Sequence, residues 1–251
     1  GDRRARSHAG IVALMGKSLC STHRPRCVLF CGSSISLAAA TTQEARKALG
    51  SKAMNDLSAR KKRARSDIRA ARTRRVPLRP ERDQRIQANL LAALADLPED
   101  TSDLTIAAFV PLADEPGGGD LHTTLATTGA RVLLPRVSRG DTPRLEWVEF
   151  QPDSPNLTPG TWGILEPIGN AVHNFPACAN VIITPGLSID YHGKRLGQGG
   201  GFYDRALVNR PAHVKVWALI DHEEFTRDVP NQDHDLVVDA VLNDLGFFPI
   251  I

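Results

Sequence analysis

The residues best suited to chemistry lie in one glycine-rich stretch, residues 190–205, which reads DYHGKRLGQGGGFYDR. Gly197 and Gly199–Gly201 supply four glycines in five positions, and they leave backbone N–H groups uncovered by side chains. Such N–H groups favour a phosphate when they stand at the start of a helix. Lys194 and Arg195 precede these glycines and can add charge-assisted hydrogen bonds to the same oxygens. The stretch therefore predicts phosphate binding, with a crowded turn as the alternative.

The acidic residue that follows these glycines indicates a metal. The dinucleotide fingerprint G-x-G-x-x-G is excluded, because Phe202 and Asp204 stand where its last glycine would fall. Asp204 falls in the first turn of a helix expected to begin near Phe202, where a carboxylate would repel phosphate unless a cation lay between them. Mg²⁺ is the natural bridge, because it binds one or two carboxylates together with substrate phosphates. A partner for the helix dipole is the alternative reading of Asp204.

The elements that must position these residues alternate between helices and strands. Apolar spacing predicts helices over residues 57–75, 80–97 and 120–128, the last closed by Gly129. Short apolar runs predict strands over residues 104–110, 132–134, 145–150, 181–184, 214–220 and 236–242. Residues 151–178 hold five prolines and are expected to form a long connection. This alternation predicts an α/β fold: a single three-layer domain with a mostly parallel sheet flanked by helices.

Composition separates the first 53 residues from the rest of the 251-residue chain. Residues 1–53 carry nine Lys and Arg against two acids and show no periodicity. We expect them to be an extension outside the fold, disordered or derived from upstream, with an organelle-targeting segment as the less favoured alternative. The domain proper is expected to span residues 54–251. Cys178 is the lone cysteine of that domain, which favours a reduced, cytoplasmic protein, and no apolar run is long enough to cross a membrane.

Residues 54–85 are again basic, with twelve Lys and Arg against four acids. A cluster of this kind can bind nucleic acid or phosphate, or it can form a solvated helix face. Composition alone favours the solvated face.

Six motifs in a common order make the chain resemble the 5-formyltetrahydrofolate cyclo-ligase family. The hallmark is PGL at 185–187 followed by RLGQGGGFYDR at 195–205. The other five are KKRAR at 61–65, FVPLADE at 109–115, VLLPR at 132–136, GTWGILEP at 160–167 and the segment from Pro230 to Asp235. The resemblance as a whole spans essentially residues 57–245. One departure from the family pattern is Pro116–Gly119, which is expected to form a longer and looser loop after Glu115.

The resemblance implies an enzyme that converts 5-formyltetrahydrofolate to 5,10-methenyltetrahydrofolate. It implies dependence on ATP as co-substrate and on Mg²⁺, release of ADP and phosphate, and a phosphorylated formyl (iminium phosphate) intermediate. The implied fold is the type shared with sugar-phosphate isomerases and CoA transferases. The implied partners are the two small-molecule substrates. We expect no membrane or nucleic-acid partner, and we expect a monomer.

The resemblance also implies roles for individual residues. Catalysis would fall to Lys61, Arg195 and Tyr203. ATP would be bound by Lys61, Arg65, Arg195, Leu196, Gly197, Gln198, Gly199, Gly200, Gly201, Phe202 and Tyr203. Folate would be bound by Val110, Glu115, Gln198, Gly199, Gly200, Gly201 and Phe202. Asp204 and Asp235 would hold Mg²⁺.

Two other functions compete with this interpretation. The first is a non-catalytic relative whose basic helix binds RNA, and the second is a sugar-phosphate isomerase of similar architecture. An RNA-binding module has no need of the carboxylate pair Asp204 and Asp235. An isomerase explains the glycine-rich stretch but not the basic pair Lys61 and Arg65. The sequence therefore favours the cyclo-ligase.

Overall fold

The computed structural model describes residues 34–138, 140–153, 156–232 and 235–251. The proposed targeting segment begins outside these residues, and His234 of the last family motif also lies outside them. The chain divides into two units, Gly1–Leu49 and Gly50–Ile251. Helix α1 (Ser34–Arg75) begins well before residue 57, so residues 34–53 are helical where no periodicity was found. The expectation that residues 1–53 lie outside the fold stays a prediction.

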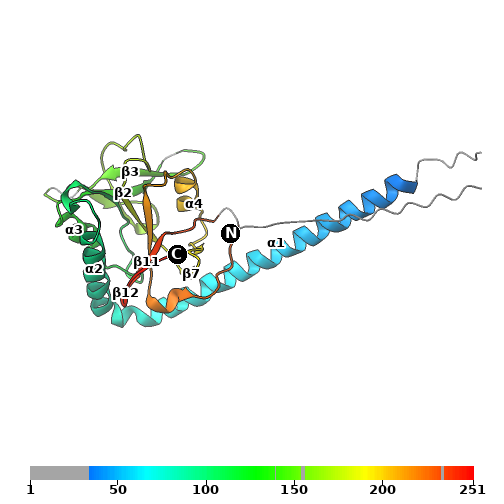
Figure 1. The fold of residues 1–251 in the computed structure, drawn as a ribbon, viewed down its shortest axis with the longest axis horizontal. Coiled ribbons are helices and arrows are strands. Elements are labelled where there is room, and N and C mark those ends of the chain that lie inside the picture. The colour runs from blue at the N-terminus through cyan, green and yellow to red at the C-terminus, as the bar shows by residue number, and fades with distance from the viewer. Residues whose placement is uncertain (1–33, 139, 154–155, 233–234) are drawn as a thin grey trace, which may run out of the picture. The chain divides into compact units, whose positions relative to one another are not determined.

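A seven-stranded sheet forms the centre of the second unit (Figure 1). Its order is β12-β11-β9-β6-β1-β2-β3, and the inner strands from β11 to β2 are all parallel. β12 and β3 pair antiparallel at the two edges. The strands are β1 (Thr105–Ala107), β2 (Arg131–Val137), β3 (Leu145–Glu149), β6 (Val181–Pro185), β9 (Lys215–Leu219), β11 (Ala240–Asn243) and β12 (Gly246–Pro249). The mostly parallel α/β fold predicted from the sequence is confirmed.

Helices cover both faces of this sheet. On one face α2 (Arg79–Ala95) and α3 (Leu121–Ala126) share an apolar core with the strands, and Ile86 and Leu90 of α2 are fully buried in it. On the other face α4 (Phe202–Leu207) contributes Leu207 to a second core. Short 3₁₀ turns are η1 (Val76–Leu78), η2 (Thr101–Asp103), η3 (Thr161–Gly163) and η4 (His222–Glu224). Each face of the sheet thus packs against helices, as a layered α/β fold requires.

A second, three-stranded sheet positions the glycine-rich stretch. It contains β7 (Ser188–Asp190), β8 (Arg195–Leu196) and β10 (Phe225–Thr226) in the order β10-β7-β8. Leu196 packs with Leu187 and Val229, and Ala64 and Ile68 of α1 cover this small core. Apolar packing therefore holds the C-terminal half of α1 beside the strand that leads into the glycines.

Two sequence expectations about connections need correction. The proline-rich segment 151–178 is not only a connection, because it contains the antiparallel pair β4 (Leu157–Pro159) and β5 (Leu165–Pro167). The segment after Glu115 is not loose: Pro116 and Gly117 are buried. Two residues of α2 hold it, since the Gly117 amide donates to Asp83 at 2.9 Å and Gln87 donates to the Gly117 carbonyl at 2.9 Å.

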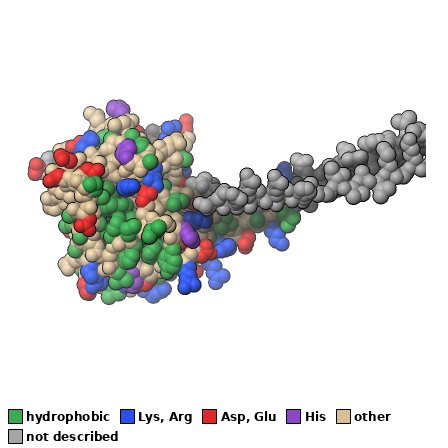
Figure 2. Space-filling view, viewed as in Figure 1, with side chains coloured by type: hydrophobic (Ala, Val, Ile, Leu, Met, Phe, Trp, Pro, Cys, Tyr) green, Lys and Arg blue, Asp and Glu red, His purple; other side chains and the backbone are tan. Residues whose placement is uncertain are grey.

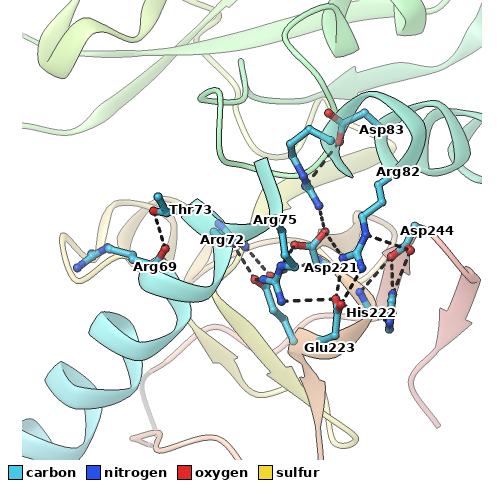
Figure 3. A network of polar contacts seen from close by, with 12 residues as sticks. Arg69, Arg72, Thr73, Arg75, Arg82, Asp83, Asp221, His222, Glu223 and Asp244 are labelled. Atoms are coloured by element: carbon cyan, nitrogen blue, oxygen red, sulfur yellow. Dashed lines mark hydrogen bonds and ion pairs between the residues drawn. The ribbon is translucent and has the colours of Figure 1, made fainter. Parts of the chain in front are cut away.

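The basic segment 54–85 is not simply a solvated face. Arg72, Arg79 and Arg82 are at most 8% exposed. Figure 3 shows arginines of this segment directed toward Asp221 and Glu223, which lie at and beside η4. Arg79 also pairs with Asp221. These arginines join the α1–α2 junction to η4 through buried and half-buried ion pairs. The pairing is what makes their burial tolerable, since an unpaired buried charge costs a large free energy.

The described surface is mixed in charge. On the face seen in Figure 2, basic and acidic side chains are interspersed among hydrophobic ones. Among the described helices, none combines the length and the apolar character needed to span a bilayer.

Candidate functional site

A large cavity of about 1160 Å³ opens beside the glycine-rich stretch. Its walls come from α1, from the segment after β1, from β2, β3 and β5, from β8 with the glycines and the start of α4, and from the loop before β11. The residues to which the family resemblance assigns roles all line it, namely Lys61, Arg65, Val110, Glu115, Arg195, Leu196, Gly197, Gln198, Gly199, Gly200, Gly201, Phe202, Tyr203, Asp204 and Asp235. Residues that are up to 174 positions apart in sequence therefore share one cavity wall.

Helix α1 directs a row of basic side chains into this cavity. Lys61, Arg65, Arg69 and Arg72 all line it, and their spacing of four, four and three residues puts them on one helix face. We call these four residues the basic row. A row of cations along one cavity wall is suited to a polyanionic ligand.

The glycine-rich loop, Gly197–Gly201, runs from β8 into α4, and α4 begins at Phe202 as predicted. Gly199 and Gly201 have φ values of +109° and +64°, a region that side chains rarely adopt. A Cβ atom on Gly197 would stand 2.8 Å from the Arg195 guanidinium, so glycine there allows the arginine to lie against the backbone. Arg65 donates to the Gly197 carbonyl at 2.9 Å, and this bond ties the loop to the basic row.

Arg195 is buried at the base of the loop. It donates to the Pro185 carbonyl at 2.9 Å and to Asp204 Oδ1 at 3.2 Å. Burial alone would raise the pKa of Asp204, but the Arg195 guanidinium and the Leu236 amide outweigh it and lower that pKa. Asp204 is therefore a carboxylate at neutral pH.

Tyr203 packs against the Arg195 guanidinium and the Trp147 ring. Its ring lies 5.7 Å from the Arg195 guanidinium carbon and 6.1 Å from the Trp147 ring. Burial raises the pKa of its phenol. Tyr203 therefore stays protonated at neutral pH and can donate a hydrogen bond, but it cannot serve as a ready base.

Asp235 forms an ion pair with Lys61, the first residue of the basic row. The Lys61 ammonium lies 2.6 Å from Asp235 Oδ2, and it also donates to Gln232 at 3.2 Å. Both side chains of the ion pair are largely buried, at 10% and 16% exposure. The pair fixes the ammonium at the cavity wall, where a phosphate oxygen could compete with Asp235 for it.

Asp204 and Asp235 are two cavity carboxylates that could bind a divalent cation. Asp204 Oδ1 accepts the Leu236 amide at 3.0 Å, so both carboxylates are anchored to the same turn. Within the described part of the chain, no three His, Cys, Asp or Glu side chains form a metal cluster on their own. Two carboxylates with phosphate oxygens and waters are nevertheless the usual surroundings of Mg²⁺ in nucleotide sites.

Glu115 and Val110 lie on the wall formed by the segment after β1. Glu115 is 8% exposed; its Oε2 accepts the Leu112 amide at 3.1 Å, and its Oε1 accepts Gln198 Nε2 at 3.2 Å. Val110 and Phe109 supply apolar surface beside it. A buried carboxylate next to apolar side chains can recognise a flat ring with N–H groups on its edge.

Sequence reasoning missed half of the basic row. Arg69 donates to Gln198 and Arg72 lines the same cavity, yet neither belongs to the motif at 61–65. The helical period would have found both, since they stand four and seven residues after Arg65. Asp204 and Asp235, by contrast, stand within the motifs, and both line the cavity. Their binding of Mg²⁺ stays a prediction.

Comparison with known proteins gives a consistent result. Residues 57–244 match the sequence profile of the 5-formyltetrahydrofolate cyclo-ligase family. The 5-formyltetrahydrofolate cyclo-ligase of Mycolicibacterium smegmatis is 36% identical over 151 residues, which cover 55% of this chain and 72% of that protein. The Escherichia coli K12 protein of the same name is 29% identical over 173 residues, or 68% of this chain and 94% of that one. The solved structure of Aquifex aeolicus 5,10-methenyltetrahydrofolate synthetase superposes with a TM-score of 0.58 at 26% identity, covering 76% and 92% of the two chains.

Proposed function

Because this chain belongs to the 5-formyltetrahydrofolate cyclo-ligase family, we propose that it uses ATP to close 5-formyltetrahydrofolate to 5,10-methenyltetrahydrofolate. ADP and phosphate are the other products. The observation that carries the proposal is a single cavity that holds the basic row, the glycine-rich loop, two aspartates and a buried glutamate. These groups match a polyphosphate, a bridging cation and a flat heterocycle, which the reaction must bring together.

The chemistry needs activation because a formamide carbon is a poor electrophile. In the proposed first step the formyl oxygen forms a bond to the γ-phosphorus of ATP as the bond to the ADP oxygen breaks. The product is an iminium phosphate whose carbon carries a good leaving group. N10 then attacks that carbon and loses its proton, and phosphate departs with the former formyl oxygen.

Phosphoryl transfer depends mainly on positioning and on neutralising charge. The backbone N–H groups of the glycine-rich loop and the cations Lys61, Arg65 and Arg195 supply both. Lys61 is the best placed to follow the transferred phosphoryl group, since its ammonium can exchange Asp235 for a phosphate oxygen. Protonated Tyr203 adds a neutral donor at the start of α4.

Asp204 and Asp235 would hold Mg²⁺, which when bound neutralises phosphate charge. The contacts of the two aspartates prepare them to bind a cation, because Arg195 keeps Asp204 ionised and Lys61 keeps Asp235 turned toward the cavity. On the wall formed by the segment after β1, Glu115 accepts hydrogen bonds from the N–H edge of the pterin. Val110 contacts the ring face.

The proposal is tested by mixing the protein with 5-formyltetrahydrofolate, ATP and Mg²⁺ and following the absorbance of the methenyl product. We expect product to form only when all three are present, and chelation of the metal to stop it. Product formed at an equal rate without ATP would contradict the proposal. So would a folded protein that binds ATP but forms no product under any of these conditions.

A further inference from the structure

Hydrogen bonds join three side chains that come from three separate segments of the cavity wall. Arg69 of α1 donates to Gln198 Oε1 from Nε at 3.0 Å and from Nη2 at 2.7 Å, and Nη2 also reaches the Gln198 carbonyl at 3.1 Å. Gln198 Nε2 donates in turn to Glu115 Oε1 at 3.2 Å. We call Arg69, Gln198 and Glu115 the polar bridge.

The charges at its two ends fix the orientation of the central amide. The Gln198 oxygen faces a guanidinium and its NH₂ faces a carboxylate. The flipped amide would set donor against donor at Arg69 and acceptor against acceptor at Glu115. The amide dipole therefore points one way, and the hydrogen bonds on either side of it polarise one another.

The bridge also restrains the glycine-rich loop. Gly199, next to Gln198, has a φ of +109°, and glycines restrict a backbone least. The position of the loop is accordingly set by side chains that hold its carbonyls, namely Arg65 at Gly197, Arg69 at Gln198 and Arg205 at Gly200. Glu115 holds the same residue as Arg69 does, at another atom, because it accepts from the Gln198 side-chain Nε2 at 3.2 Å.

Glu115 can accept further hydrogen bonds while it remains part of the polar bridge. Each of its oxygens accepts one described hydrogen bond, from Leu112 and from Gln198, and a carboxylate has about four lone-pair sites. A ligand with two N–H donors can therefore bind Glu115 without displacing Gln198. Such a ligand would immobilise the carboxylate, and through it the amide and the loop.

We propose that the polar bridge couples the two halves of the cavity, so that occupancy of Glu115 by folate orders the glycine-rich loop for ATP. Arg69 and Gln198 are positioning residues in this scheme. The inference rests on the proposed function and adds a thermodynamic link between its two substrates. Linkage is reciprocal, so ATP must strengthen folate binding by the same factor.

The experiment measures the dissociation constant of a non-hydrolysable ATP analogue with and without saturating 5-formyltetrahydrofolate, by calorimetry on the full chain with Mg²⁺. In the parent protein we expect folate to tighten analogue binding by about fivefold or more, within the range typical of coupled sites. Gln198→Leu keeps the size of the side chain but can neither accept from Arg69 nor donate to Glu115. It should reduce the coupling factor to about one.

Arg69→Met breaks the same bridge at its other side and should give the same loss. The double variant should lose no more than either single variant, because both remove one connection. Arg205→Met is the matched control: Arg205 also holds the loop, through the Gly200 carbonyl at 2.9 Å, but it is not part of the bridge. Its coupling factor should stay within twofold of the parent's.

The outcomes separate the two claims. If both ligands bind the parent independently, the bridge proposal is overturned while the proposed function stands. Coupling that survives in both Gln198→Leu and Arg69→Met also overturns it. If the folded parent binds neither ligand, the proposed function fails and the bridge proposal fails with it.

Discussion

Replacing Lys61 by methionine is expected to lower kcat/KM for methenyl formation by about 10²- to 10³-fold, the usual effect of removing one donor that stabilises transition-state charge. Methionine retains the length of the side chain and removes only the ammonium. The loss should be expressed mainly in kcat, because the charge that Lys61 meets is greatest during phosphoryl transfer. Steady-state kinetics at varied ATP concentration would measure the effect.

The neighbouring lysine provides the control for this experiment. Lys62 is exposed and does not line the cavity, so Lys62→Met removes the same charge from the same helix turn without touching the site. It should change kcat/KM by less than about twofold, as surface substitutions usually do. Equal rates for Lys61→Met and Lys62→Met, with circular dichroism showing both folded, would remove Lys61 from the mechanism.

The largest expected effect on stability comes from Arg72, which joins the cavity to the ion network of Figure 3. Its guanidinium binds Glu224 at 2.6 and 2.9 Å and the Gly186 carbonyl at 2.5 Å, and both side chains of the pair are at most 2% exposed. Burial raises the pKa of Glu224, although Arg72 and Arg75 oppose that shift. Arg72→Met should lower the free energy of unfolding by about 3–5 kcal/mol, because it leaves a buried carboxylate with one partner fewer.

Urea unfolding followed by circular dichroism measures this loss, and two further variants identify its cause. Arg74→Met alters an exposed arginine of the same helix turn and should change stability by at most about 0.5 kcal/mol. Adding Glu224→Gln to Arg72→Met removes the buried carboxylate charge that has lost its Arg72 partner. The double variant should regain at least half of the lost free energy of unfolding. A cost below about 1 kcal/mol for Arg72→Met would show that the pair is not needed to hold α1 in place.

The sequence predicted the glycine-rich loop well because its signals are local. Gly199 and Gly201 occupy positive φ, and α4 begins at Phe202, where the motif and the helix signal coincide. The parallel strands were also found, since each is a short apolar run. β12 was missed because it is an edge strand that forms no buried run: Phe247 is half-buried and Phe248 is exposed.

The basic segment shows where sequence reasoning stopped. Arg65 and Arg72 lie on the same helix and both line the cavity, but the Arg72 guanidinium is also paired with buried Glu224, which is 152 residues away along the chain. Composition cannot distinguish these environments, because the acidic partners become neighbours only when η4 packs against the α1–α2 junction. The polar bridge was hidden for the same reason: Gln198 and Glu115 are 83 residues apart.

The most direct test of the central claim follows the formyl oxygen itself. 5-Formyltetrahydrofolate labelled with ¹⁸O in the formyl group is incubated with the protein, ATP and Mg²⁺, and the inorganic phosphate released is analysed by mass spectrometry. If ATP phosphorylates the formyl oxygen, each phosphate must carry one ¹⁸O atom, and one phosphate must appear for each methenyl group formed. Unlabelled phosphate, with the ¹⁸O recovered in water, would contradict the account, because ATP would then be hydrolysed without activating the formyl group.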